Sequence, residues 1–271
     1  MTGAPAPVAY DKFLVRIREV EVVRCTPVSA TMRRLTLGGP GAVAFESGIF
    51  DEHVKLIFPD PETGELRLPT ENDEGSLDWP RPFPTSREYT IRAYRPEVDE
   101  FDIDFVIHDG GLASDWARDA QPGSRLHVAG PPGGYRVSDL YDFYVAVADE
   151  TSLPALARWL EEMPRTHRGH AVIAVSGPQS QQELAAPEGV QVTWLHHGEG
   201  APTVLHGVPD IVTIPAGARV FAWLAGEAGS IKPLRAWVRQ DLGLGKEHSS
   251  ITGYWKFGSA DTHEHLDDDE D

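Results

Sequence analysis

Arg87-Glu88-Tyr89-Thr90-Ile91-Arg92 combines cations, an aromatic ring and a hydroxyl within one predicted strand. In a regular pleat Tyr89 and Ile91 share one face, while Thr90 and Arg92 lie on the other. A flavin dinucleotide would use these groups: the Tyr89 ring for the isoalloxazine, the Thr90 hydroxyl near a ring nitrogen, and a guanidinium for the pyrophosphate. Arg87 is the first candidate for that guanidinium and Arg92 the second. The alternative is an exposed edge strand with two solvated arginines.

A second stretch, residues 108–117, reads His-Asp-Gly-Gly-Leu-Ala-Ser-Asp-Trp-Ala and follows an alternating apolar run at 101–107. The pattern predicts a strand, a Gly-Gly turn and a short helix with Ser114 or Asp115 near its start. Free amides at a helix N-terminus bind phosphate, and small residues let a ligand approach the backbone. The candidate contacts are His108, Gly111, Leu112, Ala113 and Ser114. The alternative is a plain strand-turn-helix in which the glycines serve only the turn.

The chain changes character near its middle. From Phe13 to about Ser138, short apolar or alternating runs separated by Gly, Pro and acidic turns are typical of an antiparallel β-barrel. After Tyr141, compact apolar strands alternate with helices, which favours an open, largely parallel sheet with cofactor loops at its carboxyl edge. We therefore expect two domains, 1–138 and 139–258, and a disordered acidic tail at 259–271. Two further segments are expected as loops: 61–84 and most of 198–217.

Six ordered motifs together carry a family resemblance that runs from about Val20 to Gly258. They are residues 87–92, 108–117, Gly130-Pro131-Pro132-Gly133, Asp149-Glu150-Thr151-Ser152-Leu153-Pro154-Ala155, Trp223-Leu224-Ala225-Gly226-Glu227 and Gly253-Tyr254-Trp255-Lys256. In this order they resemble the siderophore-interacting proteins, which are FAD-dependent ferric-siderophore reductases of the ferredoxin-reductase superfamily. The resemblance implies an FAD-binding β-barrel, a domain like those that bind NAD(P)H, and a ferric siderophore as substrate. The electron donor would be NADPH, NADH or a ferredoxin.

The turn at Asp149-Glu150-Thr151-Ser152 lies where a doubly wound sheet binds a nucleotide. Its two acidic side chains would repel a phosphate, so Thr151 and Ser152 are expected to cap the helix and to contact a nucleotide through hydroxyls and amides. The resemblance implies a role for Asp149, Glu150, Thr151 and Ser152 near the FAD adenine or the nicotinamide dinucleotide. After a later strand, Gly226-Glu227 offers a carboxylate either to a ribose or to the next helix as a cap. Trp255 either covers the flavin or packs the C-terminal strand.

The substrate side depends on charge. Many ferric siderophores are anionic, and a chain with a net charge of -18 repels them unless cations converge locally. The resemblance implies a small basic cluster beside the flavin, and Lys55 and Lys256 match its positions. Pro132 stands where many relatives look basic, so Arg136 is proposed as the third member. The alternative for each lysine is a solvated position on a strand.

Composition narrows the remaining choices. A single cysteine, Cys25, excludes an internal disulfide and any thiolate cluster for zinc or iron–sulfur. The acidic balance argues against nucleic acid and anionic membranes as partners. The chain has no apolar run of membrane-spanning length and no basic-then-apolar leader, so we expect a cytoplasmic protein. Tail residues His263 and His265 are expected to be solvated, with stray metal binding as the alternative.

Electron transfer to iron requires no general acid or base, so no catalytic side chain and no resident metal are predicted. Two other functions remain open from the sequence. One is a flavin or ferredoxin-type reductase for a different acceptor. The other is a non-enzymatic carrier that only binds the ferric complex.

Overall fold

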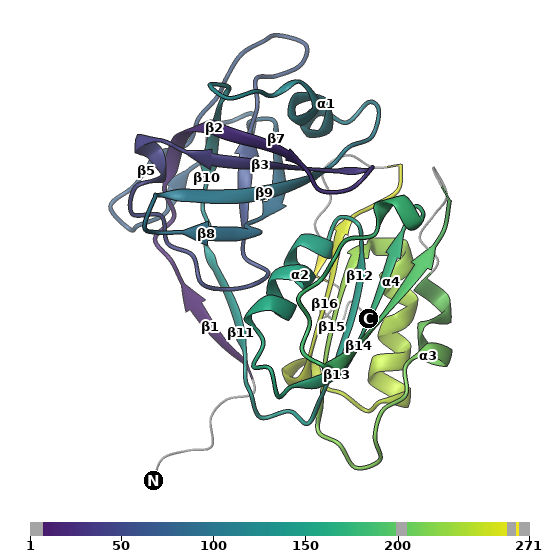
Figure 1. The fold of residues 1–271 in the computed structure, drawn as a ribbon. Helices are drawn as coiled ribbons and strands as arrows, with labels where there is room; N and C mark the ends of the chain where they lie inside the picture. The colour runs from purple at the N-terminus through teal and green to yellow at the C-terminus, as the bar shows by residue number, and fades with distance from the viewer. Residues whose placement is uncertain (1–7, 199–204, 259–263, 266–271) are drawn as a thin grey trace. The chain divides into compact units, whose positions relative to one another are not determined.

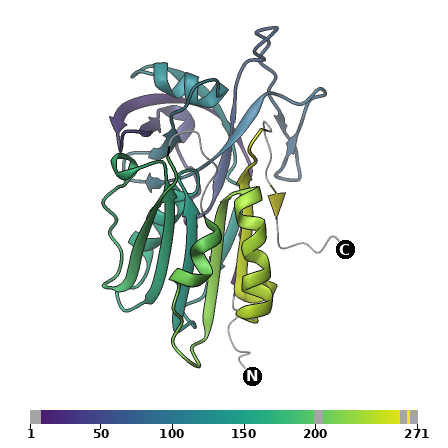
Figure 2. The same ribbon diagram turned by 90° about the vertical axis from the view of Figure 1, so that its right-hand side faces the viewer.

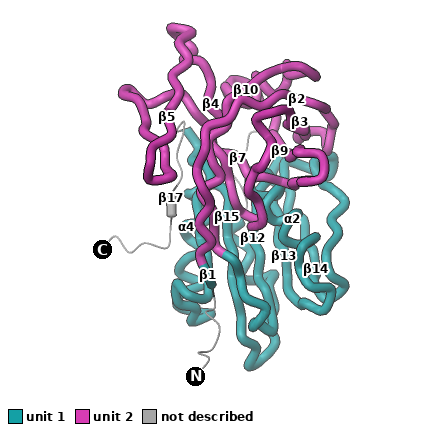
Figure 3. Tube along the Cα trace, turned by 90° about the vertical axis from the view of Figure 1, so that its left-hand side faces the viewer, with its two compact units in different colours: residues 1–9, 136–271 teal, residues 10–135 magenta. Residues whose placement is uncertain are grey.

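The computed structural model describes residues 8–198, 205–258 and 264–265. They form two compact units, which Figure 3 distinguishes by colour. Tyr10–Tyr135 form the first unit along the chain, here called the barrel unit, which is magenta in Figure 3. The described residues from Arg136 onward, together with Val8 and Ala9, form the second unit, which is teal. The chain passes from the first unit to the second between Tyr135 and Arg136, within strand β11 (Gly133–Val137), which pairs with β1 (Val8–Lys12).

The unit at 10–135 is built on one seven-stranded antiparallel sheet. Its strands, in their order across the sheet, are β7 (Ser86–Thr90), β4 (His53–Ile57), β10 (Arg125–Ala129), β2 (Ile17–Pro27), β3 (Met32–Gly38), β9 (Glu100–Val106) and β8 (Ala93–Arg95). Alternation along β2 places Val20 and Val22 in the core and leaves Glu19 and Glu21 exposed, as the sequence pattern predicts. Helix α1 (Leu112–Asp119) contributes Ala113 and Ala117 to the same core (Figure 1).

A two-residue link joins the two edge strands of this sheet. Strands β7 and β8 lie at its opposite edges, yet only Ile91 and Arg92 separate them in the chain. Three Cα–Cα steps join Thr90 to Ala93, a span of at most about 11 Å, so the sheet must curl towards a barrel for both edges to approach each other there. The prediction of one strand through the whole stretch from Arg87 to Arg92 is therefore wrong at its end. The Ile91 N–H donates to Glu52 and the Arg92 N–H to Asp102, so consecutive amides bond to different elements.

The second unit contains a parallel sheet. Its strands lie in the order β14 (Gly189–His196), β13 (Arg168–Val175), β12 (Phe143–Asp149), β15 (Val220–Glu227) and β16 (Ser249–Trp255). Alternate residues of the central strands face opposite helices. Tyr144 and Trp223 pack towards Trp159 of α2 (Leu153–Glu162), whereas Val145 and Leu224 pack in the cluster that contains residues of α3 (Val208–Ile211) and α4 (Ala228–Ala236). Figure 2 shows the sheet from the α4 side.

Short elements correct several expectations. The predicted loop at 61–84 contains a small hairpin, β5 (Thr70–Glu71) and β6 (Leu77–Asp78). Helix α4 continues past Ala236 as a π-helical turn at Trp237–Asp241. Short 3-10 turns lie at Pro40–Ala42, Pro178–Ser180, Leu205–Gly207 and Lys246–His248.

The predicted disordered tail is wrong at Glu264–His265, which form strand β17 and pair with Thr252 and Gly253 of β16. The remainder of 259–271, including His263, lies outside the described residues. Within the described part of the chain, no helix is long and apolar enough to cross a membrane. The same residues contain no group of three or more His, Cys, Asp or Glu side chains placed to hold a metal ion.

Candidate flavin and nucleotide sites

Arg87 and Tyr89 lie on one face of β7. Their partners on β4 are Leu56 and Val54, both fully buried, and directly paired residues share a face of the sheet. Tyr89 and Arg87 thus start from the core side of the barrel, and both remain partly exposed. Arg87 donates to the carbonyl of Ser86 at 2.7 Å, which orients the guanidinium along the strand.

Tyr89 links β7 to helix α1 through a chain of rings. Its ring lies 4.4 Å, centroid to centroid, from Phe105 of β9, and Phe105 lies 6.1 Å from Trp116 of α1. Burial raises the pKa of the Tyr89 hydroxyl well above its ordinary value, so the phenol stays neutral. The ring packing holds the strand that carries Arg87 in a fixed relation to the helix.

The start of α1 is open to an anion. Gly110 has a φ of +75°, which favours glycine, and Gly111 occupies the N-cap position without any side-chain cap hydrogen bond. A Cβ on Gly111 would clash with the His108 ring. The Ser114 hydroxyl accepts from the His108 N–H at 2.8 Å and donates to the His108 carbonyl at 2.7 Å. Ser114 therefore shapes the turn with its side chain, which leaves the first-turn amides of Leu112 and Ala113 as the candidate donors for an anion.

Arg92 and Thr90 lie in a different environment. The Arg92 side chain is 9% exposed, and its Nε lies 3.9 Å from the Asp104 carboxylate, which Arg34 also binds at 2.6 and 2.8 Å. Thr90 is buried as well. An arginine that already shares a buried carboxylate is less suited to hold a diphosphate, so of the two candidate guanidiniums the geometry favours Arg87.

The residues of the barrel unit fit an FAD diphosphate. Arg87 supplies a partly exposed guanidinium, and α1 supplies uncapped amides and a positive helix end. Gly111 keeps the turn free of a side chain, as a close backbone approach requires. Tyr89 offers an aromatic ring on the same face as Arg87.

At the carboxyl edge of the parallel sheet, Asp149 is a structural hub. Its carboxylate accepts from the Thr151 N–H at 2.8 Å and the Thr151 hydroxyl at 2.6 Å, both in its own turn. It also accepts from the Glu227 N–H at 2.7 Å and from Trp255 Nε1 at 2.8 Å, so it ties the ends of β12, β15 and β16 together. Burial raises the pKa of Asp149, and these four donors oppose that rise.

The neighbouring residues complete the hub. Gly226, with a φ of +150°, has no side chain because a Cβ there would lie 2.7 Å from Asp149 Oδ2. Ser152 occupies the N-cap position of α2 but makes no cap bond. Its hydroxyl accepts from the Asp149 N–H at 3.0 Å and donates to the Ala225 carbonyl at 2.7 Å. The expectation that Thr151 and Ser152 cap the helix is therefore wrong, because Asp149 and Ala225 engage both hydroxyls.

Glu227 is a helix cap. Its carboxylate accepts from the Ser230 N–H at 2.6 Å at the start of α4 and from the Phe257 N–H at 3.2 Å. Burial pushes the pKa of Glu227 up, but the surrounding backbone N–H groups outweigh burial and lower it. Of the two alternatives for Glu227, the structure shows the cap. Trp255 donates to Asp149, which shows a packing and tethering contact for that residue.

Sequence reasoning missed the partner of Glu150. Glu150 Oε1 accepts from the Ser176 N–H at 2.8 Å and from the Ser176 hydroxyl at 2.9 Å, and Ser176 in turn bonds to Ser180 at 2.7 Å. The available signal was the Ser-Gly-Pro-Gln-Ser run at 176–180, directly after a buried strand. Polar residues with Gly and Pro at that point mark a loop on the carboxyl edge.

The three predicted substrate-side cations come from both units. Lys55 forms an ion pair with Glu88 across β4 and β7, and its side chain is 40% exposed. Glu88 also lies 3.8 Å from His53. Arg136 is exposed on β11, and Lys256 is exposed just after β16. Glu88 thus partly compensates the charge of Lys55, which the sequence did not predict.

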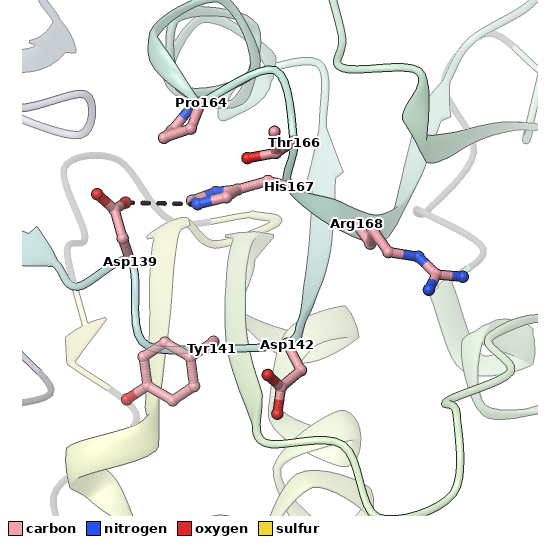
Figure 4. A pocket seen from close by; sticks show the side chains of 7 residues that line it. All are labelled: Asp139, Tyr141, Asp142, Pro164, Thr166, His167 and Arg168. Atoms are coloured by element: carbon pink, nitrogen blue, oxygen red, sulfur yellow. Dashed lines mark ion pairs between the residues drawn. The ribbon is translucent and has the colours of Figure 1, made fainter.

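A pocket of about 530 Å³ lies in the second unit, at the amino ends of β12 and β13 (Figure 4). His167 lies 3.5 Å from Asp139 across it and stacks on Tyr144, and burial lowers the pKa of His167 despite that carboxylate. Open parallel sheets bind nucleotides at the carboxyl ends of their strands, so this hollow lies at the wrong edge for a cofactor.

Comparisons with known proteins agree over most of the chain, in both units. Residues 21–135 match the model of the siderophore-interacting FAD-binding domain, and residues 141–258 match that of the siderophore-interacting protein family. An NADPH-dependent ferric-chelate reductase of Escherichia coli is 39% identical over 81% of this chain and 85% of its own length. The ferric vibriobactin reductase ViuB of Vibrio cholerae is 31% identical over 89% of this chain and 90% of its own.

Solved structures give the same result. A siderophore utilization protein from T. fusca is 38% identical and superposes with a TM-score of 0.85, covering 95% of this chain and 99% of that one. A ferredoxin-NADP+ reductase from Plasmodium falciparum, at 9% identity, covers 91% of this chain and 100% of that one with a TM-score of 0.65. That second likeness shows the ferredoxin-reductase fold alone. With an FAD-binding β-barrel followed by a parallel-sheet domain of this fold, the chain belongs to the siderophore-interacting protein family.

Proposed function

We propose that the protein is a ferric-siderophore reductase that uses FAD to pass electrons from NAD(P)H to a bound ferric siderophore. The observation that carries this proposal is the similarity, across both units, to relatives named as ferric-chelate and ferric vibriobactin reductases. The barrel geometry supports it, because Arg87 and the open end of α1 fit the diphosphate of FAD.

The proposed reaction releases iron by changing its charge. Anionic oxygen ligands hold the hard, higher-charged Fe(III) much more tightly than Fe(II), so adding one electron loosens the complex. One NAD(P)H gives two electrons as a hydride, which reduces two ferric complexes to two ferrous ones and releases one proton. FAD, when bound, supplies the conversion between a two-electron donor and a one-electron acceptor.

The chain's own residues bind and orient the reactants. Arg87 and the first-turn amides at Leu112 and Ala113 hold the diphosphate, and Tyr89 supplies a ring beside the isoalloxazine. Lys55, Lys256 and Arg136 attract an anionic ferric complex, with Glu88 moderating the charge at Lys55. A ferredoxin is proposed as an alternative donor. The cytoplasm is proposed as the place of action, because NAD(P)H is available there.

The direct test uses the purified protein reconstituted with FAD under anaerobic conditions. Adding NADH or NADPH should bleach the flavin absorbance, and adding a ferric siderophore should restore it while a ferrous chelator develops colour. Two ferrous ions per nicotinamide oxidised is the expected stoichiometry. A protein that cannot be loaded with FAD would indicate a carrier. A reduced flavin that no ferric siderophore reoxidises would indicate a reductase for another acceptor.

A further inference from the structure

The strand order fixes where a nicotinamide dinucleotide would bind in the second unit. From β12 the chain proceeds through β13 to β14 on one side, and then returns to β15 and β16 on the other. The direction therefore reverses between β12 and β15, and ligands of such sheets bind at the carboxyl end of that reversal. In dinucleotide-binding sheets of this kind, a residue at the carboxyl end of the strand that follows the first one, here β13, contacts the 2′ position of the ribose. An acidic residue there selects a hydroxyl, and an arginine selects a phosphate.

At this position the protein has a carboxylate in place. Glu150 leaves the end of β12 and accepts both the N–H and the hydroxyl of Ser176, the first residue after β13. A backbone N–H with a neighbouring hydroxyl offers two donors to one anionic oxygen. In this chain the carboxylate of Glu150 occupies both donors, so a negative charge already lies at this turn.

The loops after β13 and β14 contain no lysine or arginine. From Gly169 to Ala218 the sequence contains neither lysine nor arginine, and this range covers the loops that follow β13 and β14. The flanking Arg168 and Arg219 lie at the amino ends of β13 and β15. An eight-residue strand separates them from the carboxyl edge by roughly 23 Å, well beyond the Debye length of about 8 Å at physiological salt.

Two histidines lie at the carboxyl end of β14. The side-chain nitrogen of Gln181 lies 2.8 Å from Nε2 of His196. The His197 N–H bonds to the Val175 carbonyl at 3.2 Å, and the Gly198 N–H bonds to the Ser176 carbonyl at 3.0 Å. These backbone bonds hold His197 next to the Ser176 turn, so a cation introduced at this position would lie close to Glu150.

We propose that the carboxyl edge of this sheet selects NADH over NADPH, with Glu150 as the residue that sets the preference. A 2′-phosphate carries a charge of about -1.5 to -2 near neutral pH, and it would meet the Glu150 carboxylate without a lysine or arginine from the loops after β13 and β14. A ribose 2′-hydroxyl carries no charge and can donate to a carboxylate. The inference rests on the proposed function only in taking a nicotinamide nucleotide as donor.

Binding without turnover tests the preference directly. Isothermal titration of the FAD-loaded full chain with ADP-ribose and with 2′-phospho-ADP-ribose compares the two nucleotides without any hydride transfer. We expect ADP-ribose to bind about tenfold more tightly or better. Equal affinities, tighter binding of the phosphorylated fragment, or binding of neither fragment would each overturn the proposal.

Variants then test the residue. Glu150→Gln keeps an oxygen that accepts from Ser176 and removes only the charge, so it should strengthen binding of 2′-phospho-ADP-ribose about tenfold and leave ADP-ribose nearly unchanged. Glu188→Gln is the matched control, because it removes one exposed carboxylate at the opposite end of β14. An unchanged preference in Glu150→Gln, or an equal change in both variants, would overturn the role of Glu150.

A second variant adds a positive charge instead of removing the negative charge of Glu150, so the proposal can still be tested if Glu150→Gln does not fold. His197→Arg places a permanent cation beside the Ser176 turn and should strengthen binding of the phosphorylated fragment alone. No gain in that variant would contradict the placement of the 2′ position. Reoxidation of dithionite-reduced protein by a ferric siderophore is measured alongside. Its failure would reject the reductase function, whereas a reversed nucleotide preference would reject only the donor assignment.

Discussion

The first-turn amides of helices α1 and α4 differ in whether the protein supplies their hydrogen-bond acceptors. At α1 of the barrel unit, the N-cap is Gly111 and no side chain caps the helix. At α4 of the parallel-sheet unit, Glu227 caps the helix, and Asp149 binds the turn amides of Thr151 and Glu227 nearby. The proposed diphosphate site thus leaves its donors open, whereas at the carboxyl edge of the parallel sheet the protein's own carboxylates satisfy the donors. Unused donors therefore indicate an anion site better than the presence of a helix start does.

The strongest test of this contrast is Asp149→Ala. It leaves the buried N–H of Glu227 and the partly buried donors of Thr151 and Trp255 without their acceptor, at about 1 to 3 kcal/mol for a buried donor and less for the others. We expect the free energy of unfolding to fall by about 3 to 5 kcal/mol in urea titrations. Asp210→Ala, at an exposed position, should change it by less than about 0.5 kcal/mol. A loss below about 1 kcal/mol for Asp149→Ala would mean that the hub does not stabilise the unit.

The matching test in the barrel is Arg87→Ala, which should affect ligand binding more than folding. Losing a charge-assisted bond to the diphosphate should weaken FAD binding by about 1.5 to 3 kcal/mol, or roughly 10- to 150-fold. Flavin fluorescence titration of the apoprotein measures the affinity. Arg125→Ala serves as control, because that side chain is 65% exposed and pairs only with Glu19 among the contacts shown. An unchanged FAD affinity in a folded Arg87→Ala protein would contradict the proposal that Arg87 binds the FAD diphosphate.

Within the barrel unit, Asp102 differs from the open end of α1, because it is a carboxylate whose partners are the protein's own side chains. It accepts from the Thr36 hydroxyl at 2.8 Å and from Arg95 at two bonds of 2.7 Å. Burial raises the pKa of Asp102, and these donors outweigh burial and lower it below 3.8. A carboxyl group with a lower pKa in the folded than in the unfolded protein stabilises the fold at pH values above the unfolded-state pKa. This contribution disappears as the pH falls through the folded-state pKa.

Asp102→Asn should therefore cost about 1.5 to 3 kcal/mol at pH 7. The difference from the parent protein should persist down to about pH 4 and shrink below 3.8, as measured by urea unfolding across pH. A difference that stays constant to pH 2 would mean that the lost interaction does not depend on the charge of Asp102.

The smallest expected effect is at the substrate side. Lys55→Gln with Lys256→Gln should raise the KM for an anionic ferric tricatecholate about two- to fivefold at low salt, with the difference fading at high salt. A neutral ferric hydroxamate should change little. Lys232→Gln, an exposed lysine on α4, controls for net charge. Equal changes for both substrates would indicate a structural role for the lysines.

Local patterns predicted most of the fold. The alternating runs predicted before Ser138 include Val20 and Val22, which lie on a half-buried strand, and the compact apolar strands predicted after Tyr141 include 144–148, which is buried. The break between β7 and β8 was not predictable, because Ile91 and Arg92 bond to Glu52 and Asp102 from other parts of the barrel. Such a break depends on closure of the sheet, and neighbouring residues carry no signal for it.

The candidate sites show the same division. The Gly-Gly turn before α1 was predictable, because turn and helix-start signals lie within a few residues. The roles of Asp149 and Glu227 were not, because Asp149 meets Glu227 and Trp255 at separations of 78 and 106 residues. The compensation of Lys55 by Glu88 likewise follows from strand register, which the sequence of either strand alone does not determine.

The pairing of β2 with β10 has a consequence for how the chain is made. Val20 of β2 pairs with Leu126 of β10, so one edge of β2 has no partner strand until the ribosome has added about a hundred more residues. At translation rates of about 5 to 20 residues per second, that wait lasts roughly 5 to 20 s. During this time β2 presents an unpaired edge, which is where nascent chains associate wrongly. Glu19, Glu21 and Arg24, exposed along the strand, give the growing polypeptide charges that keep this edge from joining another.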